Sequence, residues 1–342
     1  SLRVPRVSST VREAMAETGE LAQLLEANGY AMSGESPNQE LLSKLPKKVK
    51  ARVAALKKLQ LDSIAIEAKF YERVHALEKE FEGDFGKIFE QRRKVISGEY
   101  EPTAEETTLP LLHGATEEEI KKMDDDSAPD AGEVGIPDFW LNTLKTSEGV
   151  QDMIQDHDEP ILKHLVDITS TIELNPVGFT LYFHFAENPF FTDKVLTKKY
   201  ELQLTPDEED PFDYDGPSVT KSFGSDIHWK DGKNVTKKII KKKQKKGANA
   251  GKFLTKTVKA DSFFNFFETI EHASGDNKNE EDEDEETAEL ERADFEVGQI
   301  IRDHVVPRAV LFYTGEAADP DMFDGFDEGD EGDDDESETD DE

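Results

Sequence analysis

Residues 45–97 constrain the fold of this chain most, because no proline interrupts them after Pro46 and apolar residues recur through them at helical intervals. Intervals of three and four residues place side chains on one face of an α-helix. The residues with this spacing are Leu45, Val49, Val53, Leu56, Phe70, Val74, Leu77, Phe81 and Ile88. Pro46 suits the first turn of the helix, and Gly98 suits the position after its end. Such a helix would be about 70–80 Å long, which is more than one globular core covers.

A helix of this length must bury its apolar face against another long surface. The simplest such surface is a second copy of the same helix, antiparallel to the first in a symmetric dimer. We therefore predict a dimer interface formed by Val49, Val53, Leu56, Phe70, Val74, Leu77 and Phe81. The alternative is a pair of shorter helices inside one subunit, because Gly83 and Gly86 each cost about 1 kcal/mol of helix propensity.

Negative charge is concentrated in two stretches of the chain, whose formal net charge is −36. Residues 316–342 contain 16 acidic residues and no basic one, and residues 276–291 contain 10 acidic residues and one lysine. Carboxylates in such numbers attract strongly basic proteins, and salt screens much of this attraction. A disordered acidic tail can bind in this way without a fixed interface. The alternative is a tail that only increases solubility.

Positive charge is concentrated in residues 230–259, which contain 12 lysines and one acidic residue. We interpret this stretch as a basic hairpin over residues 226–259 that carries a nuclear import signal. The lysines of the predicted signal are Lys237, Lys238, Lys241, Lys242, Lys243, Lys245 and Lys246. Two alternatives remain, namely contact with nucleic-acid phosphates and a charged, protected sheet edge. No aromatic residues alternate with the lysines, so base stacking is not indicated.

Residues 136–315 have the pattern of an α+β domain. Apolar and polar residues alternate over 179–185 and 196–204, which predicts two half-buried strands. Residues 231–234 are expected to form a hairpin turn. Helices are expected over 147–157, from 159 to 172, from Ser262, and over 290–313, where Pro307 interrupts them and Gly315 ends them. The outward faces of the first two helices would present Asp152, Asp156, Asp158, Glu159 and Asp167.

The residues that catalysis or a cofactor requires do not form a recognisable site. The chain has no cysteine, and none of its eight histidines has the paired helical spacing of a zinc hydrolase. The segment Gly247–Phe253 approximates a phosphate-binding loop but has one residue too few, and Phe253 occupies the position of the Ser or Thr that binds magnesium. We therefore expect no enzyme, no cofactor and no metal. No apolar stretch reaches the length of a membrane span.

Several segments together resemble the nucleosome assembly protein family of histone chaperones. The matching segments are residues 45–60, 89–102, 135–146, 156–168, 188–202, 226–246, 261–271 and 306–317, followed by the acidic tail. The resemblance implies an obligate homodimer held by the long antiparallel helix. It also implies a four-stranded antiparallel sheet, backed by helices, that forms an acidic concave surface for histones. Members of the family shuttle between cytoplasm and nucleus, and their import signal maps here to residues 237–246, where it would bind an import receptor.

The resulting prediction divides the chain into five parts. These are an N-terminal arm (1–45), the dimerisation helix (46–98), an acidic accessory insertion (99–135), the histone-binding α+β domain (136–315) and a disordered acidic tail (316–342). The predicted function is that of an ATP-independent chaperone of core histones, with preference for the dimer-forming pair, in nucleosome assembly, exchange and nuclear import. Beside the five helix acids named above, the predicted histone-binding residues are Glu280, Glu281, Asp282, Glu283, Asp284, Glu285 and Glu286.

Two other functions remain open from the sequence. One is an architectural protein that binds nucleic acid through the lysine-rich hairpin, although no specific nucleic-acid binding is expected. The other is an acidic carrier of basic cargo that has no assembly activity.

Overall fold

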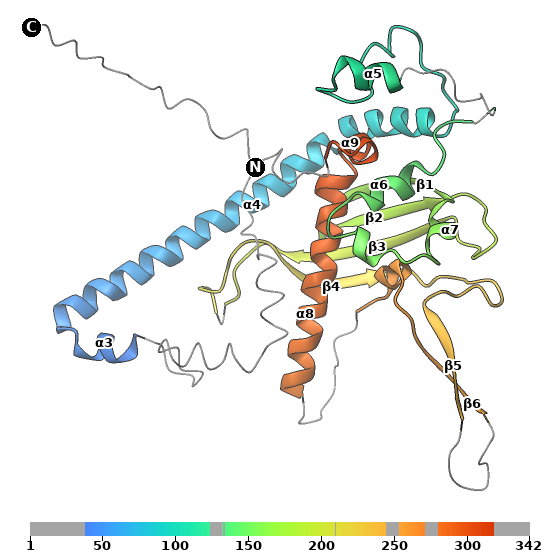
Figure 1. Ribbon diagram of the computed structural model, residues 1–342. Coiled ribbons are helices and arrows are strands. Elements are labelled where there is room, and N and C mark those ends of the chain that lie inside the picture. The colour runs from blue at the N-terminus through green and yellow to red at the C-terminus, as the bar shows by residue number, and fades with distance from the viewer. Residues whose placement is uncertain are drawn as a thin grey trace, which may run out of the picture. The chain divides into compact units, whose positions relative to one another are not determined.

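The computed structural model describes residues 38–123, 132, 134–208, 210–243, 253–270 and 280–317 (Figure 1). The chain divides into two compact units. One unit is Ser1–Glu67 with Asp207–Tyr214, and the other is Ala68–Pro206 with Asp215–Glu342. In the first unit the short helix α3 (Gln39–Lys44) precedes the long helix α4, and the ammonium group of Lys57 lies 5.1 Å from the ring centroid of Phe212.

Helix α4 (Lys47–Ile96) is continuous over 50 residues, so the prediction of one long helix is confirmed. Gly83 and Gly86 lie inside this helix without breaking it. Its end is fixed by Gly98, whose φ of 72° is in the left-handed region that favours glycine. A Cβ atom at this position would lie 2.7 Å from the backbone nitrogen of Gly135. The approach of the returning chain therefore excludes any side chain at Gly98.

A four-stranded antiparallel sheet forms the centre of the second unit, with the strand order β1-β2-β3-β4 (Figure 1). Its strands are β1 (Leu165–Leu174), β2 (Val177–Phe185), β3 (Val195–Gln203) and β4 (Ser218–Gly224). The alternating patterns over 179–185 and 196–204 correspond to β2 and β3, so both predicted strands are confirmed. The expected four-stranded antiparallel sheet is confirmed, although the position of β4 in the sequence was not predicted.

The helix expected from residue 159 to 172 is wrong, because α7 (Glu159–Leu162) is short and β1 follows it. A bulge between Leu165 and Asp167 explains the error. The extra residue breaks the alternation of the strand, so that Leu165 and Ile168 are both buried although they are three residues apart. An irregular strand thus reproduces the spacing of a helix.

The core of this unit lies between the sheet and a layer of short helices. Phe179, Phe183 and Phe185 alternate along β2 and are buried. Phe183 packs edge-to-face against Phe267, with ring centroids 5.0 Å apart. The elements that accompany the sheet are α6 (Phe139–Lys145), η1 (Gln151–Met153), α7, η2 (Phe263–Phe267), α8 (Glu280–Gln299), the π-helix η3 (Ile300–Val305) and α9 (Ala309–Thr314). Gly315, with a φ of 82°, ends α9 as expected.

The basic hairpin is formed by β5 (Lys237–Lys243) and β6 (Phe253–Lys259), which pair antiparallel. The turn expected at 231–234 does not join two strands of a hairpin, so this part of the prediction is wrong. The segment before it makes a single bridge, in which Trp229 pairs with Phe191. In the accessory insertion, α5 (Glu117–Met123) begins with a capping box, in which Thr116 N donates to the Glu119 carboxylate at 2.8 Å.

Glycine at position 298 allows α8 to lie close to β3. A Cβ atom there would lie 2.5 Å from Cε2 of Tyr200, whose ring is fully buried. We predict that Gly298→Ala lowers the free energy of unfolding by about 1–3 kcal/mol through overpacking. The matched control is Gly83→Ala in α4, where a Cβ atom would meet nothing within 4 Å. It should raise the free energy of unfolding by about 0.5–1 kcal/mol. Urea denaturation of both variants tests the opposite signs, and equal effects would contradict this account.

Candidate interaction surfaces

One face of α4 carries large apolar side chains that are exposed in the described structure. The exposed members are Leu56, Leu59, Ile66, Phe70, Leu77, Phe81, Phe85 and Ile88, with exposed fractions between 45% and 69%. In the second unit, the opposite face of α4 packs against the sheet. Nε2 of His75 lies 2.9 Å from the carbonyl oxygen of Glu173, and the Ile172 amide donates to the Glu82 carboxylate at 2.7 Å. Exposed apolar side chains of this size indicate a protein interface.

The predicted dimer residues divide into two groups. Leu56, Phe70, Leu77 and Phe81 are exposed in this face, and Val74 is half-buried at its edge. Val49 and Val53 are also half-buried. Helical periodicity turns Val53 about 100° away from Phe70 around the axis of α4. Val49 and Val53 thus lie beside the exposed face, and their place in the dimer interface stays a prediction. Ile88, which has the spacing described above, is also exposed in this face. Leu59 and Ile66 complete it, and a full helical projection of residues 47–96 could have identified these two.

Two of the predicted acids, Asp152 in η1 and Asp156, are exposed. Neither carboxylate has a partner among the described residues. Glu159 is half-buried and forms an ion pair with Lys145. Only Asp152 and Asp156 therefore meet the expectation of free acids on the domain surface.

Asp158 is buried and serves the fold. Its Oδ1 accepts a hydrogen bond from Ser262 Oγ at 2.6 Å, and its Oδ2 accepts from the backbone nitrogen of Phe263 at 2.8 Å and from that of Gln155 at 3.0 Å. These bonds join the segment before α7 to the start of η2. The expectation that Asp158 lies on an outward helix face is wrong, because its carboxylate is used to satisfy backbone donors.

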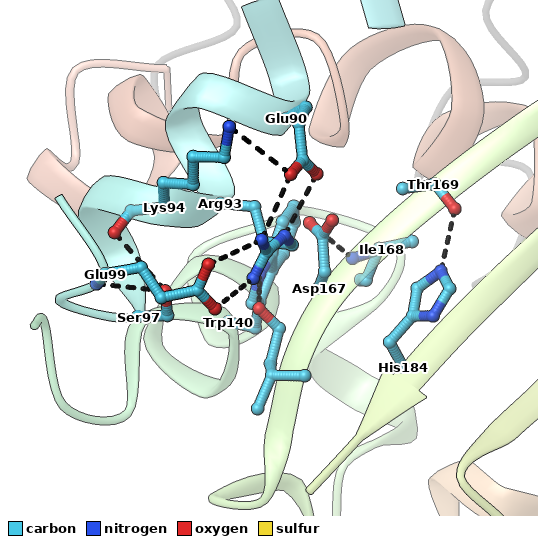
Figure 2. A network of polar contacts seen from close by, with 11 residues as sticks. Glu90, Arg93, Lys94, Ser97, Glu99, Trp140, Asp167, Ile168, Thr169 and His184 are labelled. Carbon is cyan, nitrogen blue, oxygen red and sulfur yellow. Dashed lines mark hydrogen bonds and ion pairs between the residues drawn. The ribbon is translucent and has the colours of Figure 1, made fainter. Parts of the chain in front are cut away.

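Asp167 lies in β1 and not on a helix, and only 3% of it is exposed (Figure 2). Its Oδ1 accepts a hydrogen bond from Ile168 N at 3.0 Å. Burial raises the pKa of Asp167 to about 6, and the guanidinium groups of Arg92 and Arg93 only partly offset this effect. The expected exposed position of Asp167 is therefore also wrong, and this acid is not part of the proposed histone-binding surface.

The guanidinium group of Arg92, whose charge acts on Asp167, contacts two aromatic rings. Its guanidinium carbon lies 4.6 Å from the ring centroid of Phe89 and 5.1 Å from that of Trp140. Nη1 donates to the carbonyl oxygen of Val306. Burial lowers the pKa of Arg92, and the charge of Asp167 opposes this shift.

The raised pKa of Asp167 predicts a pH-dependent gain in stability for Asp167→Asn. The folded protein keeps the proton up to about pH 6, whereas the unfolded chain loses it near the ordinary value of 3.8. Between these values the unfolded state binds fewer protons, so the Asp167 carboxyl lowers stability as the pH rises. At pH 7 the variant should be about 2–3 kcal/mol more stable than the parent, and at pH 4 the difference should nearly vanish. Urea denaturation at both pH values measures it, and a pH-independent difference would contradict the assignment.

Arg93 neutralises two other acids at the end of α4 (Figure 2). Its guanidinium bonds Glu90 at 3.0 and 3.1 Å and Glu99 at 2.6 and 2.8 Å. These interactions lower the pKa of both carboxyl groups and raise the pKa of Arg93. On the sheet beside this network, Thr169 Oγ1 lies 2.9 Å from Nε2 of His184, and burial lowers the pKa of this histidine. The acids around Arg93 are thus already paired.

The remaining predicted residues lie at the edge of the described structure. Residues 280–286 belong to the first turns of α8, but their side chains lie outside the described set. Lys237 and Lys238 are exposed on β5. Strand β5 continues through Lys241, Lys242 and Lys243, whose side chains are outside the described set. Lys245, Lys246 and residues 318–342 lie wholly outside the described residues. Ile239 and Ile240, between the described lysines, are 68% and 45% exposed.

The sequence profile named "Nucleosome assembly protein (NAP)" matches residues 51–316. The chain belongs to the nucleosome assembly protein family. Among its relatives, Nucleosome assembly protein 1-like 1 of Xenopus tropicalis is 46% identical over 289 residues, which are 82% of this chain and 72% of the relative. Nucleosome assembly protein 1-like 4 of Bos taurus is 43% identical over 292 residues, 81% of this chain and 74% of the relative.

A solved structure of Nucleosome Assembly Protein 1 from Plasmodium knowlesi aligns with 80% of this nucleosome assembly protein and 99% of that chain. The sequence identity is 26% and the TM-score is 0.48.

Members of the nucleosome assembly protein family are histone chaperones and not enzymes. Within the described residues, no three His, Asp or Glu side chains are grouped so that they could hold a metal ion. In the same part of the chain, no helix combines the length and the apolar character that crossing a membrane requires.

Proposed function

We propose that this protein is an ATP-independent chaperone of core histones, with preference for the dimer-forming pair, that acts in nucleosome assembly and exchange. The observation that carries the proposal is the family match over residues 51–316 in a chain of formal net charge −36. Carboxylates that take the place of DNA phosphates on a histone prevent non-productive histone–DNA contacts and release the histone by exchange.

The proposed histone-binding acids come from three places. The folded domain offers Asp152 and Asp156, which are exposed and unpaired, and Glu159, which first has to leave Lys145. The start of α8 adds the acidic run 280–286, and the tail adds residues 316–342. Asp158 and Asp167 are excluded from this set by their burial.

We propose further that the protein is a homodimer formed through the exposed apolar face of α4. The large side chains on this face would otherwise stay in water. A symmetric dimer places two copies of the folded acids in one particle, so that one histone dimer can engage both copies.

The lysines of β5, with the lysines that follow them, are the proposed nuclear import signal. Lys237 and Lys238 are exposed, as binding to an import receptor requires. The protein would then move between cytoplasm and nucleus. No observed feature of the described hairpin favours nucleic acid over the import receptor, so DNA binding is an outcome of the next experiment.

The proposal is tested by competition at near-physiological salt among labelled histone dimers, a short DNA duplex and the purified protein. We expect the protein to remove histones from non-nucleosomal DNA and to leave assembled nucleosomes intact. Binding of the duplex itself, lost when Lys237, Lys238 and 241–246 are neutralised, would instead support an architectural nucleic-acid-binding protein. Histone binding without competition against DNA would support a carrier of basic cargo.

Deletion of residues 316–342 separates the role of the tail from that of α4. The tail holds 16 acidic residues, so its removal should weaken histone binding about 10-fold or more and reduce the salt dependence of binding. The dimer should persist, because the exposed face of α4 is unchanged. Fluorescence titration with labelled histones and light scattering measure the two effects. Loss of the dimer on this deletion would contradict the proposed division of roles.

A further inference from the structure

Four large apolar side chains are exposed on two segments of the second unit. Leu109 and Leu111 of the accessory insertion are 84% and 65% exposed, and Val310 and Leu311 of α9 are 54% and 37% exposed. We call these four residues the apolar patch. Exposed apolar side chains of this size indicate a docking site.

Hydrogen bonds join the two segments that carry the apolar patch. The amide of His113, two residues after Leu111, donates to the carboxylate of Glu316 at 2.7 Å. The amide of Ala317 donates to the carbonyl oxygen of Leu311 at 3.0 Å, and Ala317 is itself buried. The insertion therefore meets the end of α9 at the point where the chain continues into residues 318–342.

The two segments lack the negative charge that prevails in the rest of the chain. Residues 107–114 and 308–315 contain no Asp or Glu, and they include His113 and Arg308. The next acid, Glu316, already accepts hydrogen bonds from the His113 amide and the Thr314 hydroxyl. In a chain of formal net charge −36, the segments that form the patch therefore do not repel an acidic ligand.

The residues that follow Ala317 combine apolar and acidic side chains. Met322, Phe323 and Phe326 are the only large apolar residues in 318–342, and all three lie among its first nine residues. Residues 327–342 contain 12 of the 16 acidic residues of the tail and no large apolar residue. The tail thus has a first part that carries apolar residues and a second part that is acidic throughout.

We propose that Phe323 and Phe326 dock on the apolar patch of their own subunit, so that residues 318–326 fold back over α9 and the accessory insertion. This inference goes beyond the proposed chaperone function, because it gives the apolar patch an occupant within the chain. The 12 carboxylates of residues 327–342 would stay available to a basic partner, and docking would fix the place from which they extend.

The short link from Ala317 favours this occupant over a separate molecule. Phe323 and Phe326 are six and nine residues beyond Ala317, so that an extended chain carries them at most about 20 and 30 Å. Leu311 lies next to Ala317, and both rings can therefore reach the patch. A segment on so short a link has an effective concentration in the millimolar range. Docking removes apolar surface of both the rings and the patch from water.

Hydrogen exchange tests the docking without altering the folded domain. We compare the parent protein with a deletion of residues 318–342 and with the double variant Phe323→Ser/Phe326→Ser. A docked segment protects the backbone beneath it, so amides of residues 107–114 should exchange at least about 3-fold faster in both variants. The double variant keeps all 16 acidic residues of the tail, so that loss of charge cannot produce its effect.

The matched control for exchange is Ser337→Ala/Thr339→Ala, two substitutions in the acidic second part of the tail. It should exchange like the parent protein. Equal exchange in the parent and in Phe323→Ser/Phe326→Ser would overturn the proposal. So would faster exchange in the deletion alone, because acidic residues and not the two rings would then hold the tail.

Disulfide trapping locates the docked segment. The chain contains no cysteine, so Thr108→Cys/Asp324→Cys introduces a single pair. Thr108 is exposed beside Leu109, and Asp324 follows Phe323, so neither substitution removes an apolar residue. We expect mild oxidation to form the internal 108–324 disulfide at least about 10-fold faster than in the same chain with Phe323→Ser/Phe326→Ser, whose link has equal length. Peptide mass spectrometry identifies the bond.

Two results of the trapping experiment would contradict docking within one subunit. Equal rates with and without the two phenylalanines would show that proximity along the chain alone forms the bond. A covalent dimer in place of the internal disulfide would place the tail on another chain. The variant Leu109→Ser/Leu111→Ser, followed by light scattering, tests a second copy as the occupant. The oligomeric state should not change, and dissociation would show that the apolar patch joins copies instead.

Discussion

The double variant Phe70→Glu/Leu77→Glu should be monomeric at concentrations at which the parent protein is a dimer. Phe70 is 45% and Leu77 is 53% exposed in the single chain, so both substitutions lie on the surface of the subunit. In the dimer, each burial of a large apolar side chain contributes about 1.5–3 kcal/mol. Four such side chains are lost from each dimer, and four carboxylates would lie in an apolar seam. A loss of about 6–12 kcal/mol corresponds to a rise of more than about 10,000-fold in the dissociation constant.

Sedimentation velocity measures this effect, and circular dichroism shows whether the variant still folds. Ala65→Glu is the matched control, because Ala65 is exposed on α4 but is turned about 130° away from the middle of the apolar face. It adds one carboxylate per chain, against two in the double variant, and should leave the dimer intact. A dimer that survives in the double variant, or one that dissociates equally in the control, would show that another surface joins the subunits.

Elements with a regular period could be predicted from the sequence. The stretch 45–97 shows a helical period on both sides of residues 57–69 and no proline after Pro46, and β2 and β3 alternate, so local pattern was sufficient for α4 and for two strands. Strand β1 failed because its bulge gives Leu165 and Ile168 a helical spacing. The β-branched residues among 166–172 were the available signal for a strand.

The functional residues were harder to predict, because burial depends on contacts far away in the chain. Asp158 was taken for a surface acid, yet its partner Ser262 is 104 residues distant. Asp167 was placed on a helix, and its low exposure follows from the strand it occupies. Composition correctly indicates an acidic protein, but it does not distinguish an acid that holds the fold from one that is free to bind. That distinction requires the tertiary structure.

Lys198 carries a charge whose burial composition alone does not indicate. It lies in the alternating strand 195–203 among apparently solvated lysines, yet it is fully buried. Its ammonium group forms an ion pair with Asp294 of α8 at 2.9 Å and donates to the carbonyl oxygen of Glu268 at 2.9 Å. Burial lowers the pKa of Lys198 and raises that of Asp294, and the two charges oppose these shifts. The pair joins α8 to the sheet, close to where Tyr200 meets Gly298.

Replacing Lys198 by alanine should therefore lower the free energy of unfolding by about 3–5 kcal/mol, because it leaves the Asp294 carboxylate buried without a counter-charge. The neighbouring Lys199→Ala is the control. Lys199 is partly exposed and pairs with Glu201 at 3.2 Å, so its loss should cost less than about 1 kcal/mol. Urea denaturation at one fixed protein concentration measures both, since dimerisation makes stability concentration-dependent.

The double variant Lys198→Met/Asp294→Leu tests which interaction of Lys198 stabilises the fold, the ion pair with Asp294 or the hydrogen bond to the carbonyl oxygen of Glu268. If the ion pair only satisfies two buried charges, the apolar replacement should restore most of the stability lost in Lys198→Ala. Histone binding should follow the stability of these variants, because Asp294 anchors the part of α8 from which the acidic residues 280–286 extend. If the double variant stays as unstable as Lys198→Ala, the bond from Lys198 to the Glu268 carbonyl contributes more than the ion pair, and η2 rather than α8 is the element that Lys198 anchors.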